Sequence, residues 1–160
     1  MNATCEKRHA FETAGLGLAP FRFVGCVEKK YQACHGAPIQ PGGTCDFCGN
    51  AIMECCVIIS SDGRTFMVGS VCVYKTGDAG LVRVVKADER RRKAERDAAR
   101  IVAARQTIAR DDVRSALAAK PHPMFDDSTL LNWCLWMLDH AGTSGRIKAA
   151  RSIEQAAKTI

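Results

Sequence analysis

The chain has 160 residues, enough for one domain of ordinary size or for a small domain with an extension. Hydrophobic residues make up 47% of it and charged residues 25%, a balance typical of globular proteins that excludes disordered and collagen-like chains. No run of about 18 apolar residues could span a bilayer, and no apolar export-signal segment follows the first nine residues. We therefore expect a soluble protein of the cytoplasm.

Positive charge is concentrated in one part of the chain. Lys and Arg number 23 against 17 Asp and Glu, which gives a net charge of +6. Segment 83–120 contains 12 of these basic residues and 6 of the acidic ones, so it carries the whole excess. We expect an acidic partner to be bound there.

Strand signals dominate the first half of the chain. Residues 20–35 combine aromatic, β-branched and polar residues in short runs, which predicts a strand followed by a loop. Segments 51–60 and 64–68 predict two strands joined by a tight turn at 61–63. The clearest expected structure in this half is therefore a β-hairpin.

Alternation along the first strand of this hairpin separates two neighbouring cysteines. Cys55 shares a face with the apolar Val57 and Ile59, whereas Cys56 lies on the opposite face with Glu54. We expect the face that carries Cys55 to be the apolar one, with this thiol in the core.

The second half of the chain predicts helices. From 84 to 119 it contains neither Gly nor Pro and is rich in Ala, Arg, Lys and Glu, which are strong helix formers. Asp111 and Asp112 are placed to cap a second helix after a break. A last amphipathic helix begins near Gly145.

Between these helices, residues 129–140 predict a short helix that is apolar almost all round. Asp127 or Ser128 is placed to cap its start. Trp133 and Trp136 lie three positions apart on it, so we expect both to be buried, either in the core or against a partner.

Nine cysteines are many for a chain of this length. Eight lie within the first 72 residues, and an odd number without an export signal argues against a disulfide framework. The segment Cys45-Asp-Phe-Cys48-Gly49 has the form of a zinc knuckle, in which two thiolates on a tight turn bind one cation. The glycine accepts the backbone geometry of that turn. The expected hairpin follows the knuckle, and Cys72 comes after the hairpin at the start of a further segment.

Knuckle, hairpin and helix-borne cysteine in this order resemble a treble-clef zinc finger over residues 43–80. The resemblance implies a structural Zn²⁺ held by Cys45, Cys48 and Cys72. A treble clef usually takes its fourth ligand three positions after the helix cysteine, but Lys75 stands there. We favour Cys34, from the preceding loop, as the fourth ligand. Three alternatives stay open: His35, Cys55 and Cys56.

The alternative interpretation of the cysteines is a set of buried thiols without metal. It is the favoured one for Cys5, Cys26 and Cys134, because none of them belongs to a partner motif. A thioredoxin-like redox pair at Cys45 and Cys48 is disfavoured because the β-α-β context is missing.

The expected fold class is α+β. Residues 1–80 form a zinc-stapled, β-rich module that resembles a treble clef, 81–120 a long basic amphipathic helix, and 121–160 a helical hairpin. A long Ala-rich amphipathic helix could also support a homodimer.

The basic helix is the candidate surface for nucleic acid or a protein partner. Arginine charge tracks phosphates without reading bases, and six residues are the favoured contacts: Arg90, Arg91, Arg92, Lys93, Arg96 and Arg100. The competing interpretation is a solvated helix held by ion pairs four residues apart, such as Glu89 with Lys93.

Catalytic motifs are absent from the sequence. It has no phosphate-binding loop, no H-E-x-x-H and no G-x-S-x-G, and the H-x-E of a zinc deaminase is missing. We expect a binding protein and not an enzyme.

Several segments resemble small proteins carried by bacteriophages and plasmids, whose activities are not settled. The matching segments are 43–52, 62–73, 75–78 and 129–133. The resemblance implies an accessory protein of a mobile element, which we expect to bind nucleic acid or a host complex that handles nucleic acid. The alternative is an inhibitor of a host defence system, similar to an anti-CRISPR protein, that docks on an effector complex.

Overall fold

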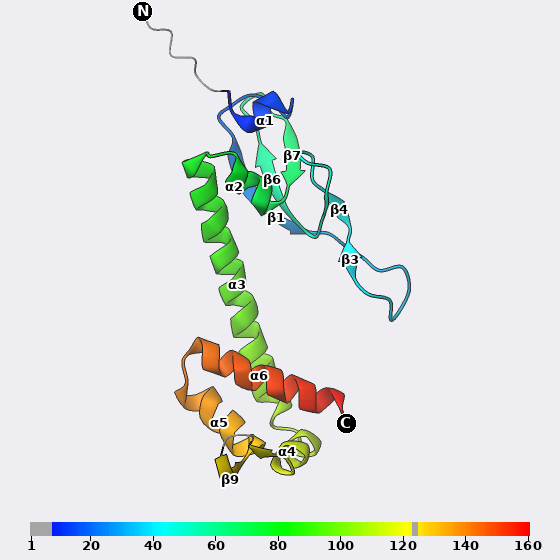
Figure 1. The fold of residues 1–160 in the computed structure, drawn as a ribbon, viewed down its shortest axis with the longest axis vertical. Coiled ribbons are helices and arrows are strands. Elements are labelled where there is room, and N and C mark those ends of the chain that lie inside the picture. Colours follow the sequence, from blue (N-terminus) through cyan, green and yellow to red (C-terminus); the bar gives the residue numbers. More distant parts are fainter. Residues whose placement is uncertain (1–7, 123–124) are drawn as a thin grey trace, which may run out of the picture. The chain divides into compact units, whose positions relative to one another are not determined.

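The structure is a computed structural model that describes residues 8–122 and 125–160, the side chains of 125–127 excepted. It confirms the α+β class, with a small antiparallel sheet near the start of the chain and helices after it (Figure 1). The chain divides into two compact units, one ending at Arg90 and the other running from Arg91 to Ile160. The segments expected as 81–120 and 121–160 both contribute to the second unit.

The first unit is built on a three-stranded antiparallel sheet. Its strands are β1 (Arg22–Glu28), β6 (Glu54–Ile59) and β7 (Thr65–Val68), with β6 in the middle. The expected hairpin is therefore present as β6 and β7. The single strand expected over 51–60 is interrupted at Met53, because β5 (Ala51–Ile52) pairs separately with β4 (Gly43–Thr44). A second small ladder joins β2 (Lys30–Tyr31) and β3 (Gln40–Pro41).

The expected apolar face of β6 is wrong. Cys56 and Ile58 belong to the core of the sheet, and Val57 and Ile59 are only half-buried. The reason is tertiary: Cys56 pairs with Val68 of β7, and these paired side chains share the face that the core covers. Cys55, on the other face, is nevertheless fully buried, because Gly43 of β4 lies against its sulfur.

A short helix, α1 (Ala10–Thr13), completes this core and has no clear signal in the sequence. His9 caps it, since its Nδ1 accepts the N–H of Phe11. The ring of Phe11 makes edge contacts with three other aromatic rings at 5.2–5.4 Å: Phe21, Phe47 and Phe66.

The second unit is helical. It contains the later part of α3 (Ala79–Thr107), then α4 (Asp111–Ala118), α5 (Leu130–His140) and α6 (Thr143–Lys158), with a small ladder of β8 (Pro121–His122) and β9 (Phe125–Thr129). Buried apolar side chains from all four helices meet in one core: Ala104, Ile108, Val113, Leu117, Cys134, Leu138, Ala149, Ala150, Ile153 and Ala156.

The N-caps of two helices differ from those expected. The break before the second helix is confirmed, but its N-cap is Arg110, and both aspartates occupy the first turn. Thr129 caps α5 by accepting the N–H of Asn132, in place of Asp127 or Ser128.

Across the described residues, no helix has the length and apolar character needed to cross a membrane.

Candidate metal centre

The knuckle is a tight turn between β4 and β5. The N–H of Gly49 donates to the carbonyl of Cys45 at 2.8 Å, and the N–H of Cys45 donates to the carbonyl of Asn50 at 2.9 Å. Gly49 has a φ of +74°, a conformation that side-chain-bearing residues rarely adopt. This turn directs the two knuckle sulfurs toward the same point.

The third sulfur comes from α2 (Ser70–Lys75), which the β6–β7 hairpin delivers to the knuckle. The Sγ of Cys72 lies 3.7 Å from that of Cys45 and 3.4 Å from that of Cys48. A disulfide needs about 2 Å. Four sulfurs around one zinc ion at about 2.3 Å lie about 3.8 Å apart, which is close to the spacing seen here. The three cysteines can therefore hold a metal ion.

The electrostatics of the three thiols fit a site for a cation. Burial favours the neutral form of Cys45, but hydrogen bonds from the backbone N–H groups of Gly69, Cys48 and Phe47 outweigh it and lower the pKa of this thiol. The pKa of Cys72 is raised to about 12, first by burial and then by its contacts with the Cys48 and Cys45 thiols. A bound cation supplies the charge that lets the clustered thiols ionise together.

The structure does not bring Cys34 to these sulfurs. Cys34 and His35 are exposed in the loop between β2 and β3, which is closed on itself by hydrogen bonds from Ala37 N–H to Cys34 O and from the Gln32 amide to Ala37 O. Cys55 and Cys56 are buried in the sheet. Among the described residues, the close group of ligand atoms comprises the three sulfurs of Cys45, Cys48 and Cys72.

A cavity of about 440 Å³ adjoins the cysteine cluster. Cys48 and Cys72 both line it, together with side chains of mixed polarity: Phe47, Asn50, Ile52, Met53, Glu54, Ser70, Val71 and Lys75. Of the three ligands, Cys45 is 1% exposed and Cys72 7%, whereas Cys48 is exposed. The site therefore opens on the side of Cys48.

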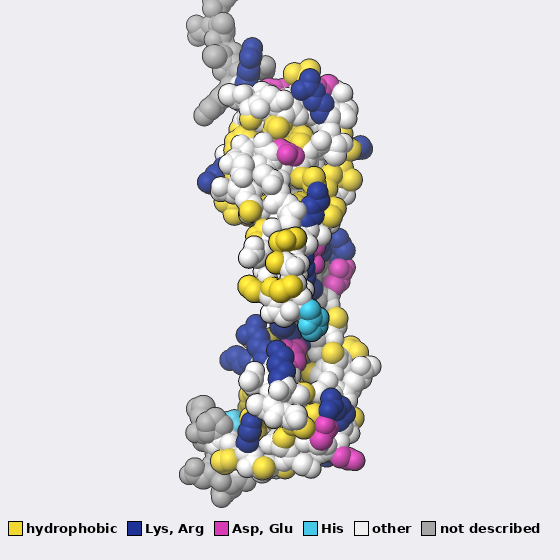
Figure 2. Space-filling view, turned by 90° about the vertical axis from the view of Figure 1, so that its right-hand side faces the viewer, with side chains coloured by type: hydrophobic (Ala, Val, Ile, Leu, Met, Phe, Trp, Pro, Cys, Tyr) yellow, Lys and Arg dark blue, Asp and Glu magenta, His cyan; other side chains and the backbone are white. Residues whose placement is uncertain are grey.

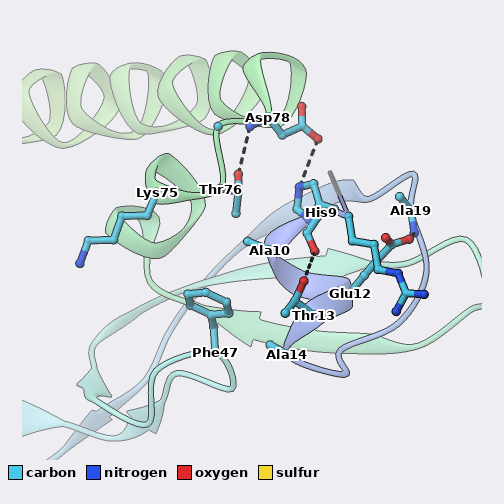
Figure 3. Close-up of a pocket in the computed structure, with 12 residues that line it drawn as sticks. His9, Ala10, Glu12, Thr13, Ala14, Ala19, Phe47, Lys75, Thr76 and Asp78 are labelled. Carbon is cyan, nitrogen blue, oxygen red and sulfur yellow. Dashed lines mark hydrogen bonds and ion pairs between the residues drawn. The ribbon is translucent and has the colours of Figure 1, made fainter. Parts of the chain in front are cut away.

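A second, larger cavity of about 1240 Å³ lies beside α1 (Figure 3). His9 points across it toward Asp78, with Nε2 3.7 Å from the Asp78 carboxylate (Figure 3). The Nδ1 of His9 accepts a hydrogen bond, so the proton of the neutral ring lies on Nε2, which is buried without a hydrogen-bond partner. No cysteine lines this cavity, but Phe47 and Lys75 belong both to its lining and to that of the cavity beside the cysteine cluster.

The basic residues favoured from the sequence lie on the middle turns of α3. Five of the six are exposed and Arg92 is half-buried. Several form ion pairs within the chain: Arg91 with Glu95 at 2.8 Å, Lys93 with Asp97 at 2.6 Å, and Arg100 with Glu154 of α6 at 2.9 Å. On the face shown in Figure 2, acidic side chains accordingly lie beside several of the basic ones. Ion pairs four residues apart, the pattern of a solvated helix, are thus present.

The two tryptophans of α5 have different environments. Trp133 is half-buried against the helical core, with its ring 5.5 Å from that of His122. Trp136 is 57% exposed and stacks on His140 one turn later. Of the two tryptophans only Trp133 packs against the core, because the helix turns Trp136 away from it; burial of Trp136 against a partner stays a prediction.

No protein family, curated protein or solved structure matches this chain in the comparisons we made. The functional interpretation therefore depends on the site itself.

Two features of the sites had little signal in the sequence. The cavity beside Cys48 is assembled from two separated segments, 47–54 and 69–75, although the i, i+3 spacing of Cys72 and Lys75 placed both residues on one side of α2. Cys26, expected as an isolated core thiol, lies opposite Cys56 in the sheet, with the two sulfurs 3.4 Å apart. Cys5 lies outside the described residues.

Proposed function

We propose that this protein is a zinc-binding accessory protein of a phage or plasmid that binds nucleic acid, or a complex that handles nucleic acid, in the host cell. Zinc is the proposed ion because three thiolates form a soft donor set and the sulfur spacing suits tetrahedral coordination. Its proposed role is to tie the knuckle to α2 and so stabilise the first unit.

One observation carries the nucleic-acid part of the proposal. Residues 90–100 of α3 consist only of charged residues and alanine, with six basic and two acidic side chains. None of these eleven residues is buried. These side chains reach solvent, so a polyanion can compete there with the ion pairs that they form within the chain.

The spacing of the arginines supports this interpretation. Arg92, Arg96 and Arg100 recur every four residues, which places them on one side of the helix at axial steps of about 6 Å. Like charges at this spacing destabilise an isolated helix by about 0.2–0.5 kcal/mol per pair. Phosphates along this side of the helix would add to the counter-charge that the chain itself supplies, as Glu154 does for Arg100. Exposed ion pairs such as Lys93 with Asp97 contribute about 0.5 kcal/mol, so phosphates can compete with them.

The proposal predicts a strong salt dependence of binding. Short labelled DNA and RNA duplexes and single strands would be titrated with the zinc-loaded protein at several salt concentrations. Replacing Arg90, Arg91, Arg92 and Arg96 with Gln should flatten the plot of log affinity against log salt by about 0.9 for each lost phosphate contact.

A matched control variant removes the same number of positive charges from segments outside α3. Arg114, Lys120, Arg151 and Lys158 are exposed on α4, α6 and the segment after α4, and their Gln variants should leave the slope nearly unchanged. Equal effects of both quadruple variants would show that net charge alone is responsible. Absence of binding to every labelled nucleic acid at low salt would refute direct binding.

A second candidate function is favoured by the exposed Trp136. Large aromatic side chains that stay in solvent often anchor protein interfaces. Docking on a subunit of a host defence complex would make the protein an inhibitor, and the basic helix could then bind an acidic surface of that subunit. Binding of a defined effector complex that is lost in Trp136→Ala, without any affinity for nucleic acid, would favour this function over the first.

A further inference from the structure

The three sulfurs occupy only part of a tetrahedral coordination shell. Their separations of 3.4 and 3.7 Å are those of neighbouring corners around one ion, which leaves a fourth corner. No Cys, His, Asp or Glu from the described ranges 8–122 and 125–160 adds a fourth atom to the group. The position one helical turn after Cys72 belongs to Lys75, whose ammonium ion is not a metal ligand.

The side of the cluster that opens to the surroundings is also the side of the cavity. Cys45 is closed off within the core, whereas Cys48 is exposed and lines the 440 Å³ cavity together with Cys72. A cavity of this volume falls in the range of small-molecule sites. A ligand in it can approach the metal from beside two of its three sulfurs.

We propose that the metal centre keeps its fourth coordination position open to this cavity and binds the thiolate of a small thiol there. The inference rests on the metal centre proposed above. The exchange involves no electron transfer: the thiol releases its proton to solvent, its sulfur forms a bond to the metal, and the water that held the position leaves.

The lining of the cavity favours a thiolate over other donors. A metal bound by three thiolates is soft and prefers sulfur to oxygen as its next ligand. A fourth thiolate adds negative charge to a cavity that Glu54 and Lys75 both line, and the ammonium group of Lys75 is the cation that offsets it. Lys75 lines both cavities, and in Figure 3 its side chain extends away from His9 and Asp78. Apolar side chains can contact the carbon part of the thiol: Phe47, Ile52, Met53 and Val71.

Cobalt substitution tests the proposal directly, because Co²⁺ takes the geometry of zinc and absorbs light. The full-length protein would be loaded with one equivalent of Co²⁺ and titrated with 2-mercaptoethanol. The sulfur-to-metal charge-transfer absorbance should rise by about one-third, as three thiolates become four, and the visible bands should shift. Gel filtration should show the cobalt still eluting with the protein. Loss of cobalt to the free thiol would overturn the proposal.

Variants identify the source of the fourth ligand. Cys34→Ser and Cys55→Ser should give the spectrum of the original protein before and after thiol addition. Lys75→Met should bind cobalt equally well but need several-fold more thiol. A four-thiolate spectrum before thiol addition, reduced by either serine variant or by Cys5→Ser, would overturn the open position. Failure to bind cobalt at all would instead refute the metal centre itself.

Discussion

At the scale of single residues, Trp133 and Trp136 place the same type of side chain in two different environments of one helix, the core and the solvent. The two indoles share a helix and lie three residues apart, yet only Trp133 packs against the core of the second unit. The His140 ring that stacks on Trp136 leaves that indole 57% exposed. A large area of aromatic surface is thus available at Trp136 for a partner.

Alanine substitution should separate these two environments. Trp133→Ala should lower the free energy of unfolding by about 2 kcal/mol, less than the 3–5 kcal/mol typical of a fully buried aromatic because the side chain is only half-buried. Trp136→Ala should cost less than about 1 kcal/mol, since it leaves no cavity in the core. Urea unfolding of the full chain, followed by circular dichroism, measures both. A larger loss for Trp136→Ala would show that the exposed indole carries structural contacts.

At the scale of elements, the turn between β6 and β7 holds the loop that follows α1. The N–H of Ser61 donates to the carbonyl of Leu18 at 2.9 Å, and its hydroxyl donates to the carbonyl of Ala19 at 2.8 Å. Gly17 makes this close approach possible: a Cβ on it would lie 2.4 Å from the Ser60 hydroxyl oxygen. The hydrogen bonds of Ser61 therefore join the loop to the hairpin, and they depend on the absence of a side chain at position 17.

Two glycines in the same loop provide a matched test of this contact. Gly15 and Gly17 both have positive φ, +76° and +127°, but only Gly17 has a neighbour in the path of a Cβ. Gly15→Ala should cost about 1 kcal/mol of stability from backbone strain, whereas Gly17→Ala should cost about 3 kcal/mol because steric overlap adds to the strain. Thermal unfolding of the zinc-loaded proteins provides the comparison. Equal losses would mean that the Ser60 side chain moves aside.

At the same scale, α3 differs along its length in what surrounds it. Leu81 and Val85 of α3 belong to the first core, whereas Ala104 of its last turns and Ile108, directly after the helix, belong to the second. Its middle has no buried residue, so its helical state there depends on propensity and on ion pairs along its own surface. The same turns are the ones that carry the proposed nucleic-acid contacts.

At the scale of the whole molecule, the two units depend on different kinds of stabilisation. The first combines a small sheet and an aromatic cluster with the metal centre, whereas the second has a helical core that includes no proposed ligand. Both tyrosines belong to the first unit and both tryptophans to the second. Each unit thus has its own fluorescence signal.

Removal of the metal should lower the thermal stability of the first unit only. The purified protein should contain one zinc per chain, and a strong chelator should lower the unfolding temperature reported by Tyr31 and Tyr74, because structural zinc contributes directly to folding. The transition reported by Trp133 and Trp136 should stay in place. Zinc content should fall in Cys45→Ser and Cys72→Ser but not in Cys134→Ser. A protein that folds fully without metal, or two signals that shift together, would contradict this prediction.

Much of the local structure follows from the sequence by itself. The knuckle at Cys45, Cys48 and Gly49, the β6–β7 hairpin and the helices of the second half were predicted because their signals are short-range: turn chemistry, alternation and helix propensity act between residues a few positions apart. The convergence of Cys72 on the knuckle was expected from the resemblance to a treble-clef finger, and in the structure the three sulfurs lie together.

Only the tertiary structure decided the remaining features. The buried face of β6, the insertion of Phe11 into the sheet's core and the exposure of Trp136 depend on which element covers which, and that choice is made by contacts between distant residues. The same holds for Cys34, which a separate β2–β3 hairpin keeps in solvent. Residue type and spacing specify what a side chain can bind, whereas its distance from other ligands is set by strand pairing and packing across the chain.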